Sequence, residues 1–175
     1  KIEELLNRKQ YIAKSDYKKL AEDYAKTIDF FNVLSGSGTL ANFCEMNRIT
    51  EAEILQMLVR GKEIDTIIDQ HNEDFVCSAM QEEKEYLDNI LKVVDPAIVL
   101  DEDQRRIVLT DEDYSLVIAG AGAGKTTTVA AKVKYLVDKQ KIDPKDILVV
   151  SFTNKAVKEL KEKIQDALGI PCPIA

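Results

Sequence analysis

A glycine-rich run between an apolar segment and a helical pattern constrains this chain more than any other feature of its sequence. The run reads Ala-Gly-Ala-Gly-Ala-Gly-Lys-Thr and occupies residues 119–126. It follows the apolar residues 115–119 and precedes a helical pattern of apolar residues over 129–137. Apart from alanine at its first position, it fits the phosphate-binding pattern of glycine, four residues, glycine, lysine and serine or threonine. Because a dinucleotide-binding loop has a different glycine spacing, the run predicts a site for a nucleoside triphosphate.

The residue types in this run suit the binding of ATP with Mg²⁺. Small residues let successive backbone N–H groups face the phosphates, and the following helix presents its positive end to them. Lys125 is expected to place its charge at the β- and γ-phosphates, and Thr126 to ligate the magnesium ion, so these two are the predicted catalytic residues. The predicted nucleotide-binding residues of this region are Ala119, Gly120, Ala121, Gly122, Ala123, Gly124, Lys125, Thr126 and Thr127.

Strand and helix patterns alternate around the loop. Residues 115–119 and 147–151 are short apolar runs typical of buried strands, whereas residues 125–137 and 154–168 have helical spacing. Strands that are apolar on both faces and alternate with helices indicate a parallel sheet. The expected fold of residues 96–175 is therefore α/β, with a P-loop at the end of a strand. No apolar strand ending in an acidic residue follows the loop, so we expect the catalytic carboxylate to lie beyond the end of this sequence.

Residues 1–95 are expected to form a separate, all-helical accessory region. Residues 50–53 have the form of a helix-capping box, and a long helical pattern runs from about residue 62 to residue 94. Pro96 is the first proline and follows this pattern, so we place the domain boundary between residues 95 and 96. His71 lies on the apolar face of the long pattern, where a structural role is favoured over a functional one.

The acidic surplus of the chain is confined to the helical region. The sequence has 24 Lys and Arg against 31 Asp and Glu, a formal net charge of −7. The whole surplus falls within residues 1–95, which argues against a broad DNA-binding surface there. No apolar run is long enough to span a membrane, and the charged N-terminus does not resemble a signal peptide. Three widely spaced cysteines fit a cytoplasmic protein, and a first residue other than Met suggests a piece of a longer one.

Three blocks of the sequence follow one another in a distinctive order: residues 100–107, the glycine-rich run and residues 147–160. They resemble the Q motif, motif I and motif Ia of UvrD/Rep-type superfamily 1 DNA helicases. The resemblance covers about residues 98–170. It implies a truncated, RecA-like motor domain that hydrolyses ATP and moves along single-stranded DNA from 3′ to 5′. Residues 71–75, in the helical region, are similar to a segment of helicase IV-like members.

Carried over by position, the resemblance implies further site residues. Gln104 would hydrogen-bond the edge of adenine, because a side-chain amide matches the donor and acceptor that the base presents. Phe152, Thr153, Asn154 and Lys155 would contact single-stranded DNA, with the aromatic ring stacking on a base. From the residues alone, Phe152 could equally be a core aromatic at the end of a strand. Many relatives carry an arginine that packs on adenine where this chain has Thr127, which implies looser base selectivity.

Three classes of function remain open at this point. The favoured one is the N-terminal part of an ATP-dependent DNA helicase, inactive by itself without the catalytic carboxylate. The second is another P-loop NTPase or a small-molecule kinase, which would need a substrate lid and an acidic residue after the loop. The third is a non-catalytic nucleotide-binding or protein-interaction module. The N-terminal helices could contact the motor, DNA or a protein partner, and their negative charge argues against a broad surface for DNA. Unpaired strand edges predict self-association.

Overall fold

The computed structural model describes residues 1–120 and 122–175, which form two compact units by their contacts. The N-terminal unit comprises Lys1–Phe75 with Asp111–Tyr114, and the C-terminal unit comprises Val76–Thr110 with Ser115–Ala175. The predicted domain boundary between residues 95 and 96 stays a prediction, because contacts describe packing and not independent folding. Among the described residues, no helix has the length and apolar character needed to cross a membrane.

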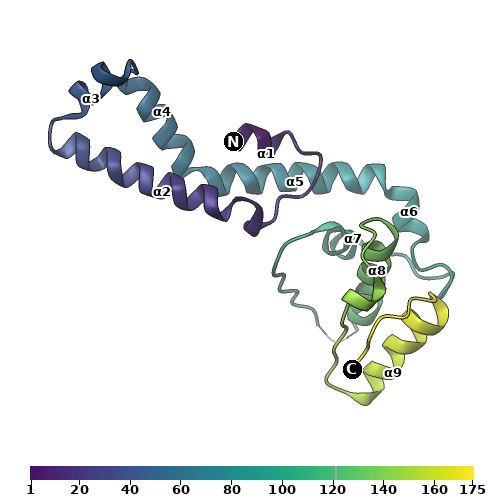
Figure 1. The fold of residues 1–175 in the computed structure, drawn as a ribbon. Helices are drawn as coiled ribbons and strands as arrows, with labels where there is room; N and C mark the ends of the chain where they lie inside the picture. The colour runs from purple at the N-terminus through teal and green to yellow at the C-terminus, as the bar shows by residue number, and fades with distance from the viewer. Residues whose placement is uncertain (121) are drawn as a thin grey trace. The chain divides into compact units, whose positions relative to one another are not determined.

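Helices build the N-terminal unit, as expected (Figure 1). One buried cluster joins α1, α2 and α5, and a second joins α2, α3 and α4 around Phe31. The predicted capping box is present at the start of α4, where the Thr50 hydroxyl accepts a hydrogen bond from the Glu53 N–H at 3.2 Å. The helices of this unit are α1 (Ile2–Leu6), α2 (Lys14–Gly36), α3 (Leu40–Asn47), α4 (Glu51–Lys62) and most of α5 (Ile64–Glu82).

A buried asparagine holds the segment that precedes α2 against α5. Asn72 Oδ1 accepts from the Ile12 N–H at 2.8 Å, and Asn72 Nδ2 donates to the Ile12 carbonyl oxygen at 2.9 Å. Both residues are buried, so these two bonds satisfy backbone groups that water does not reach. The adjacent His71 places Nε2 3.1 Å from the carbonyl oxygen of Gln10. His71 therefore has a structural contact, in line with its favoured interpretation.

Gly61 of α4 lies against the side chain of Tyr24 in α2. A Cβ atom at this position would stand 2.6 Å from Tyr24 Cδ1. We expect Gly61→Ala to lower the free energy of unfolding by about 1–3 kcal/mol, because the tyrosine ring would have to shift. Gly36→Ala is the control, since nothing lies within 4 Å of a Cβ atom there. Urea unfolding followed by circular dichroism compares the two variants, and equal effects would contradict this close packing.

The C-terminal unit packs α8 against α7, α9 and η2. The buried face of α8 includes Ala130, Ala131 and Val133. The helix predicted after the glycine-rich run is confirmed, and so is a helical segment over residues 154–167. The long helix predicted over residues 62–94 is interrupted at Glu83. The further elements of this unit are α6 (Lys84–Asn89), α7 (Glu102–Leu109), α8 (Lys125–Asp138), the 3-10 helix η1 (Pro144–Asp146), α9 (Asn154–Lys161) and the π-helical η2 (Glu162–Ala167).

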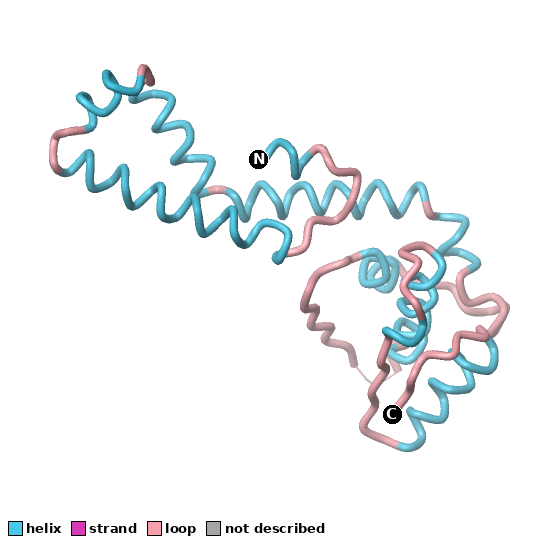
Figure 2. The backbone as a smooth tube through the Cα atoms, viewed as in Figure 1, coloured by secondary structure: helices cyan, strands magenta, loops and turns pink. Residues whose placement is uncertain are grey.

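The predicted α/β fold with a parallel sheet is wrong, because the described residues contain helices and loops but no strand (Figure 2). Residues 115–119 have no neighbouring strand, and Leu116 and Ile118 are 88% and 90% exposed. Residues 147–151 make one parallel bridge, from Val149 to Ile174. A strand is stabilised by hydrogen bonds to a neighbour, which an apolar run in the sequence does not itself supply. The strand edges expected to drive self-association are likewise not formed in this part of the chain.

Candidate nucleotide-binding site

The loop that precedes α8 has a backbone that its glycines permit. Gly122 has a φ of 80°, and Gly124, the N-cap residue of α8, has a φ of 73°. This left-handed region costs a residue with a Cβ atom roughly 1–2 kcal/mol, which accounts for glycine at both positions. The loop leads into a helix of 14 residues, whose first N–H groups make no hydrogen bond within the helix. Such a helix end attracts an anion.

Lys125 lies over this loop. Its Nζ donates to the carbonyl oxygen of Ala119 at 3.2 Å and to that of Gly120 at 2.6 Å. The residue is exposed, so its charge is held at the loop and remains accessible from solvent. Thr126 follows in the first turn of α8 and is half-buried. The predicted site residue Ala121 lies outside the described residues.

The residues around the loop fit a magnesium ion that enters with a triphosphate. Among the residues that the structure describes, no group of three or more His, Cys, Asp or Glu could hold a metal ion. Mg²⁺ commonly keeps water and phosphate oxygens as most of its ligands and needs only one or two from the protein. The hydroxyl of Thr126, next to Lys125 in the chain, is an oxygen of the required type.

Gln104 connects the start of α7 with the loop. Its N–H donates to Asp101 Oδ1 at 2.8 Å, and its Oε1 accepts from the Asp101 N–H at 3.1 Å, which makes a reciprocal cap. Its Nε2 donates to the carbonyl oxygen of Ala123 at 3.4 Å. An acidic residue followed three positions later by glutamine, as at residues 101–104, is a sequence signal for this cap. The interpretation of these residues as a Q motif did not include it. The predicted contact between Gln104 and adenine stays a prediction.

Gly124→Ala is expected to disturb the loop and Gln104 together. A Cβ atom at this left-handed position would lie 2.6 Å from Gln104 Nε2. Backbone strain should lower the free energy of unfolding by about 1–2 kcal/mol, and the glutamine amide should leave the loop. Gly120→Ala is the matched control, because nothing lies within 4 Å of a Cβ atom there and no positive φ is involved. If thermal unfolding gives both variants the same midpoint, this description of the loop is incorrect.

The residues predicted to contact DNA lie together at the start of α9. Phe152 is fully exposed, so it is not a core aromatic in this structure. The hydroxyl of Thr153 caps α9 by accepting a hydrogen bond from the Ala156 N–H at 3.2 Å. Asn154 and Lys155 are exposed in the first turn. An exposed ring beside a lysine suits a single strand, which binds through base stacking and charge. Contact with DNA stays a prediction.

Lys163 is a residue of this region that sequence reasoning missed. Its Nζ donates to Thr127 Oγ1 at 3.3 Å and pairs with Glu159 Oε1 at 2.9 Å. The side chain is only 21% exposed. Because Lys163 lies in η2, directly after α9, it connects the helix of the predicted DNA contacts with the first turn of α8. One lysine among several in a charged helix gives no signal in the sequence for this role.

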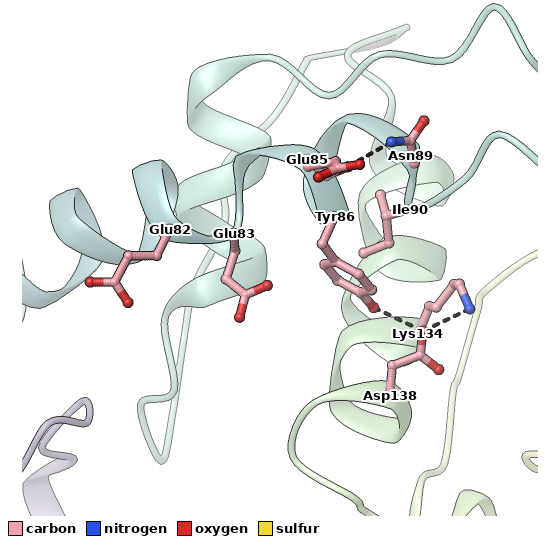
Figure 3. A pocket seen from close by; sticks show the side chains of 8 residues that line it. All are labelled: Glu82, Glu83, Glu85, Tyr86, Asn89, Ile90, Lys134 and Asp138. Atoms are coloured by element: carbon pink, nitrogen blue, oxygen red, sulfur yellow. Dashed lines mark hydrogen bonds and ion pairs between the residues drawn. The ribbon is translucent and has the colours of Figure 1, made fainter.

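A cavity of about 510 Å³ in the C-terminal unit is not a second phosphate site (Figure 3). Tyr86 Oη donates to Asp138 Oδ2 at 3.0 Å, and Lys134 Nζ pairs with the same oxygen at 2.8 Å. Burial disfavours the charged form of Asp138, but the hydrogen bonds from Lys134 and Tyr86 outweigh it and lower the pKa of this carboxyl. Half of the lining residues are acidic and would repel a triphosphate. They are Glu82, Glu83, Glu85, Tyr86, Asn89, Ile90, Lys134 and Asp138.

Comparison with known proteins singles out the part of the chain that contains the loop. Residues 100–172 match the family model described as the UvrD/REP helicase N-terminal domain. A probable DNA helicase II homolog of Mycoplasma capricolum subsp. capricolum is 45% identical over 78 residues, which are 45% of this chain and 10% of that protein. The ATP-dependent DNA helicases PcrA of Staphylococcus aureus and Staphylococcus epidermidis are each 39% identical over 70 residues, 40% of this chain and 10% of those proteins. The matched segment is thus about a tenth of the length of these curated relatives.

Proposed function

We propose that the chain is part of an ATP-dependent DNA helicase, because its residues 100–172 match the family model of the UvrD/REP helicase N-terminal domain. The complete enzyme would hydrolyse ATP and move along single-stranded DNA from 3′ to 5′. The observation that carries the proposal is a glycine loop at the N-terminus of α8, over which Lys125, the first residue of that helix, places its Nζ. Relatives that are named as DNA helicases support the same class.

The loop and the first turn of α8, residues 119–127, would bind the triphosphate. Backbone N–H groups would donate to its oxygens, and Lys125 would exchange two loop carbonyls for charge-assisted hydrogen bonds to the β- and γ-phosphates. Thr126 would ligate Mg²⁺, which neutralises part of the phosphate charge when it is bound. Gln104, whose amide already reaches the loop, would recognise adenine.

The exposed start of α9 would bind single-stranded DNA. Stacking of a base on Phe152 does not depend on its sequence, as a motor that advances along any strand requires. Lys155 would add attraction to the phosphate backbone, with Thr153 and Asn154 completing the contact. The acidic N-terminal region would not share in this binding and would instead accept a protein partner.

Location and assembly follow as part of the same proposal. A cytoplasmic location suits an enzyme that acts on DNA, and the described cysteines form no disulfide. The 175 residues by themselves are proposed not to hydrolyse ATP. Self-association was predicted from strand edges that the described residues do not form, and light scattering at high concentration would test it.

A strand-displacement assay on the full-length protein tests the function. With ATP and Mg²⁺, the protein should displace the labelled strand of a duplex that carries a 3′ single-stranded tail, and should leave a blunt duplex intact. Displacement only from a 5′-tailed duplex would overturn the polarity. If no tailed duplex is unwound, although the protein is folded and saturated with ATP, the proposed helicase activity is wrong.

A further inference from the structure

A short acidic stretch between α7 and the glycine loop belongs to the N-terminal unit by its contacts. The acidic segment, residues Asp111–Tyr114, follows the helix that carries Gln104 and precedes residues 115–120, which lead into the loop. The chain therefore leaves the C-terminal unit after Thr110 and returns to it at Ser115. No pattern in the sequence distinguishes this segment from an ordinary surface loop.

Two carboxylates of the acidic segment bind the N-terminus of α2. Glu112 Oε1 accepts from the Lys14 N–H at 2.9 Å. Asp113 Oδ2 accepts from the Ser15 N–H at 2.7 Å, and Asp113 Oδ1 accepts from the Ser15 hydroxyl at 2.7 Å. The first two N–H groups of this helix of 23 residues thus obtain partners from a distant part of the chain. The positive end of the helix strengthens the attraction of both carboxylates.

The residues before the acidic segment are fixed by hydrogen bonds, whereas those after it are exposed. Before it, Lys132 Nζ of α8 donates to the carbonyl oxygens of Val108 at 2.9 Å and Thr110 at 2.6 Å. After it, residues 114–118 are all exposed, with Tyr114 at 93%. The next contacts are those of Lys125 with Ala119 and Gly120. The exposed residues 115–118 therefore join the acidic segment, which contacts the N-terminus of α2, to the residues of the glycine loop.

We infer that the N-terminus of α2 is a docking surface for the acidic segment, through which the N-terminal unit regulates the proposed nucleotide site. Docking limits the conformations of residues 114–120, so the loop loses less conformational entropy when it binds a triphosphate. Whatever displaces Glu112 and Asp113 from α2 would weaken ATP binding, and ATP would in turn favour the docked state. This inference rests on the proposed function only in its statement about ATP.

Asp113→Ala tests docking, with Asp111→Ala as a control that removes the same atoms from an exposed neighbour in the same segment. Chymotrypsin cleaves after exposed aromatic residues, so cleavage after Tyr114 reports the freedom of the segment, and cleavage after Phe152 serves as an internal reference. Asp113→Ala should raise the ratio of these two rates about 5-fold or more, and Asp111→Ala should leave it unchanged. Ser15→Ala, which removes one hydrogen bond from the other side, should give a smaller rise in the same direction.

The affinity for ATP completes the test on the full-length protein. Asp113→Ala should weaken ATP binding about 5-fold, whereas Asp111→Ala should not. Equal cleavage ratios in wild type, Asp113→Ala and Ser15→Ala would overturn the docking. A raised ratio with unchanged ATP affinity would overturn the regulation. A wild type that does not bind ATP would refute the proposed function, and with it the regulation, while the cleavage ratio would still decide on docking.

Discussion

Lys125→Ala is expected to lower ATP turnover by the full-length protein at least about 100-fold, because it would remove the positive charge that we propose acts on the transferred phosphate. The lysine is exposed and its hydrogen bonds are to loop carbonyls, so the fold should not depend on it. Loss of charge-assisted hydrogen bonds to two phosphates should also weaken equilibrium binding of ATP by about 10-fold or more. Titration with a fluorescent ATP analogue and a steady-state assay measure the two effects.

Lys145→Ala is the control for this substitution. Lys145 is also an exposed lysine. It lies in η1 and pairs with Asp143, the N-cap residue of η1, so its ion pair includes no residue of the glycine loop. Turnover and ATP affinity should equal those of the wild type. If Lys125→Ala binds and hydrolyses ATP as Lys145→Ala does, residues 119–127 are not the nucleotide site.

Asn72→Ala is expected to destabilise the N-terminal unit by about 3 kcal/mol. The substitution removes the partner of both backbone groups of Ile12, a residue with no exposed surface. A buried group left without a partner costs roughly 1–3 kcal/mol, and here there are two. Chemical denaturation followed by circular dichroism gives the change in the free energy of unfolding.

Asn32→Ala is the control for Asn72→Ala, because it makes the same substitution at an exposed position. Asn32 is exposed in α2, where alanine is a good helix former, so its effect should stay within about 0.5 kcal/mol. Similar free energies of unfolding for the two variants would show that the hydrogen bonds of Asn72 do not hold the segment before α2 in place.

The structural features that were predictable from the sequence are local ones. The capping box at Thr50 and the helix that begins at Lys125 were predictable, because the residues that determine them lie within one or two turns. Asn72 binds a residue 60 positions away, and Asp113 binds one 98 positions away. Neither pairing leaves a periodic or spacing pattern, so neither was predicted.

The failed prediction of the sheet has the same origin. The apolar run at residues 115–119 looks like a strand, but its stability depends on a neighbour that no local pattern identifies. In the described structure residues 115–118 of this run are exposed. For Phe152, the sequence favoured a DNA contact and a core aromatic equally. Its full exposure in the structure excludes the core. For residues 115–119 and for Phe152, the sequence did not show which other residues they would contact. A stronger periodic pattern would not have supplied this.

Steady-state ATP hydrolysis by the full-length protein, with and without single-stranded DNA, tests the central claim most directly. The claim is that the glycine loop at residues 119–126 and the exposed start of α9 serve one DNA-dependent motor. It predicts hydrolysis that needs Mg²⁺, rises several-fold on addition of oligothymidylate and disappears in Lys125→Ala. Hydrolysis that is indifferent to single-stranded DNA, or that survives in Lys125→Ala, would contradict it.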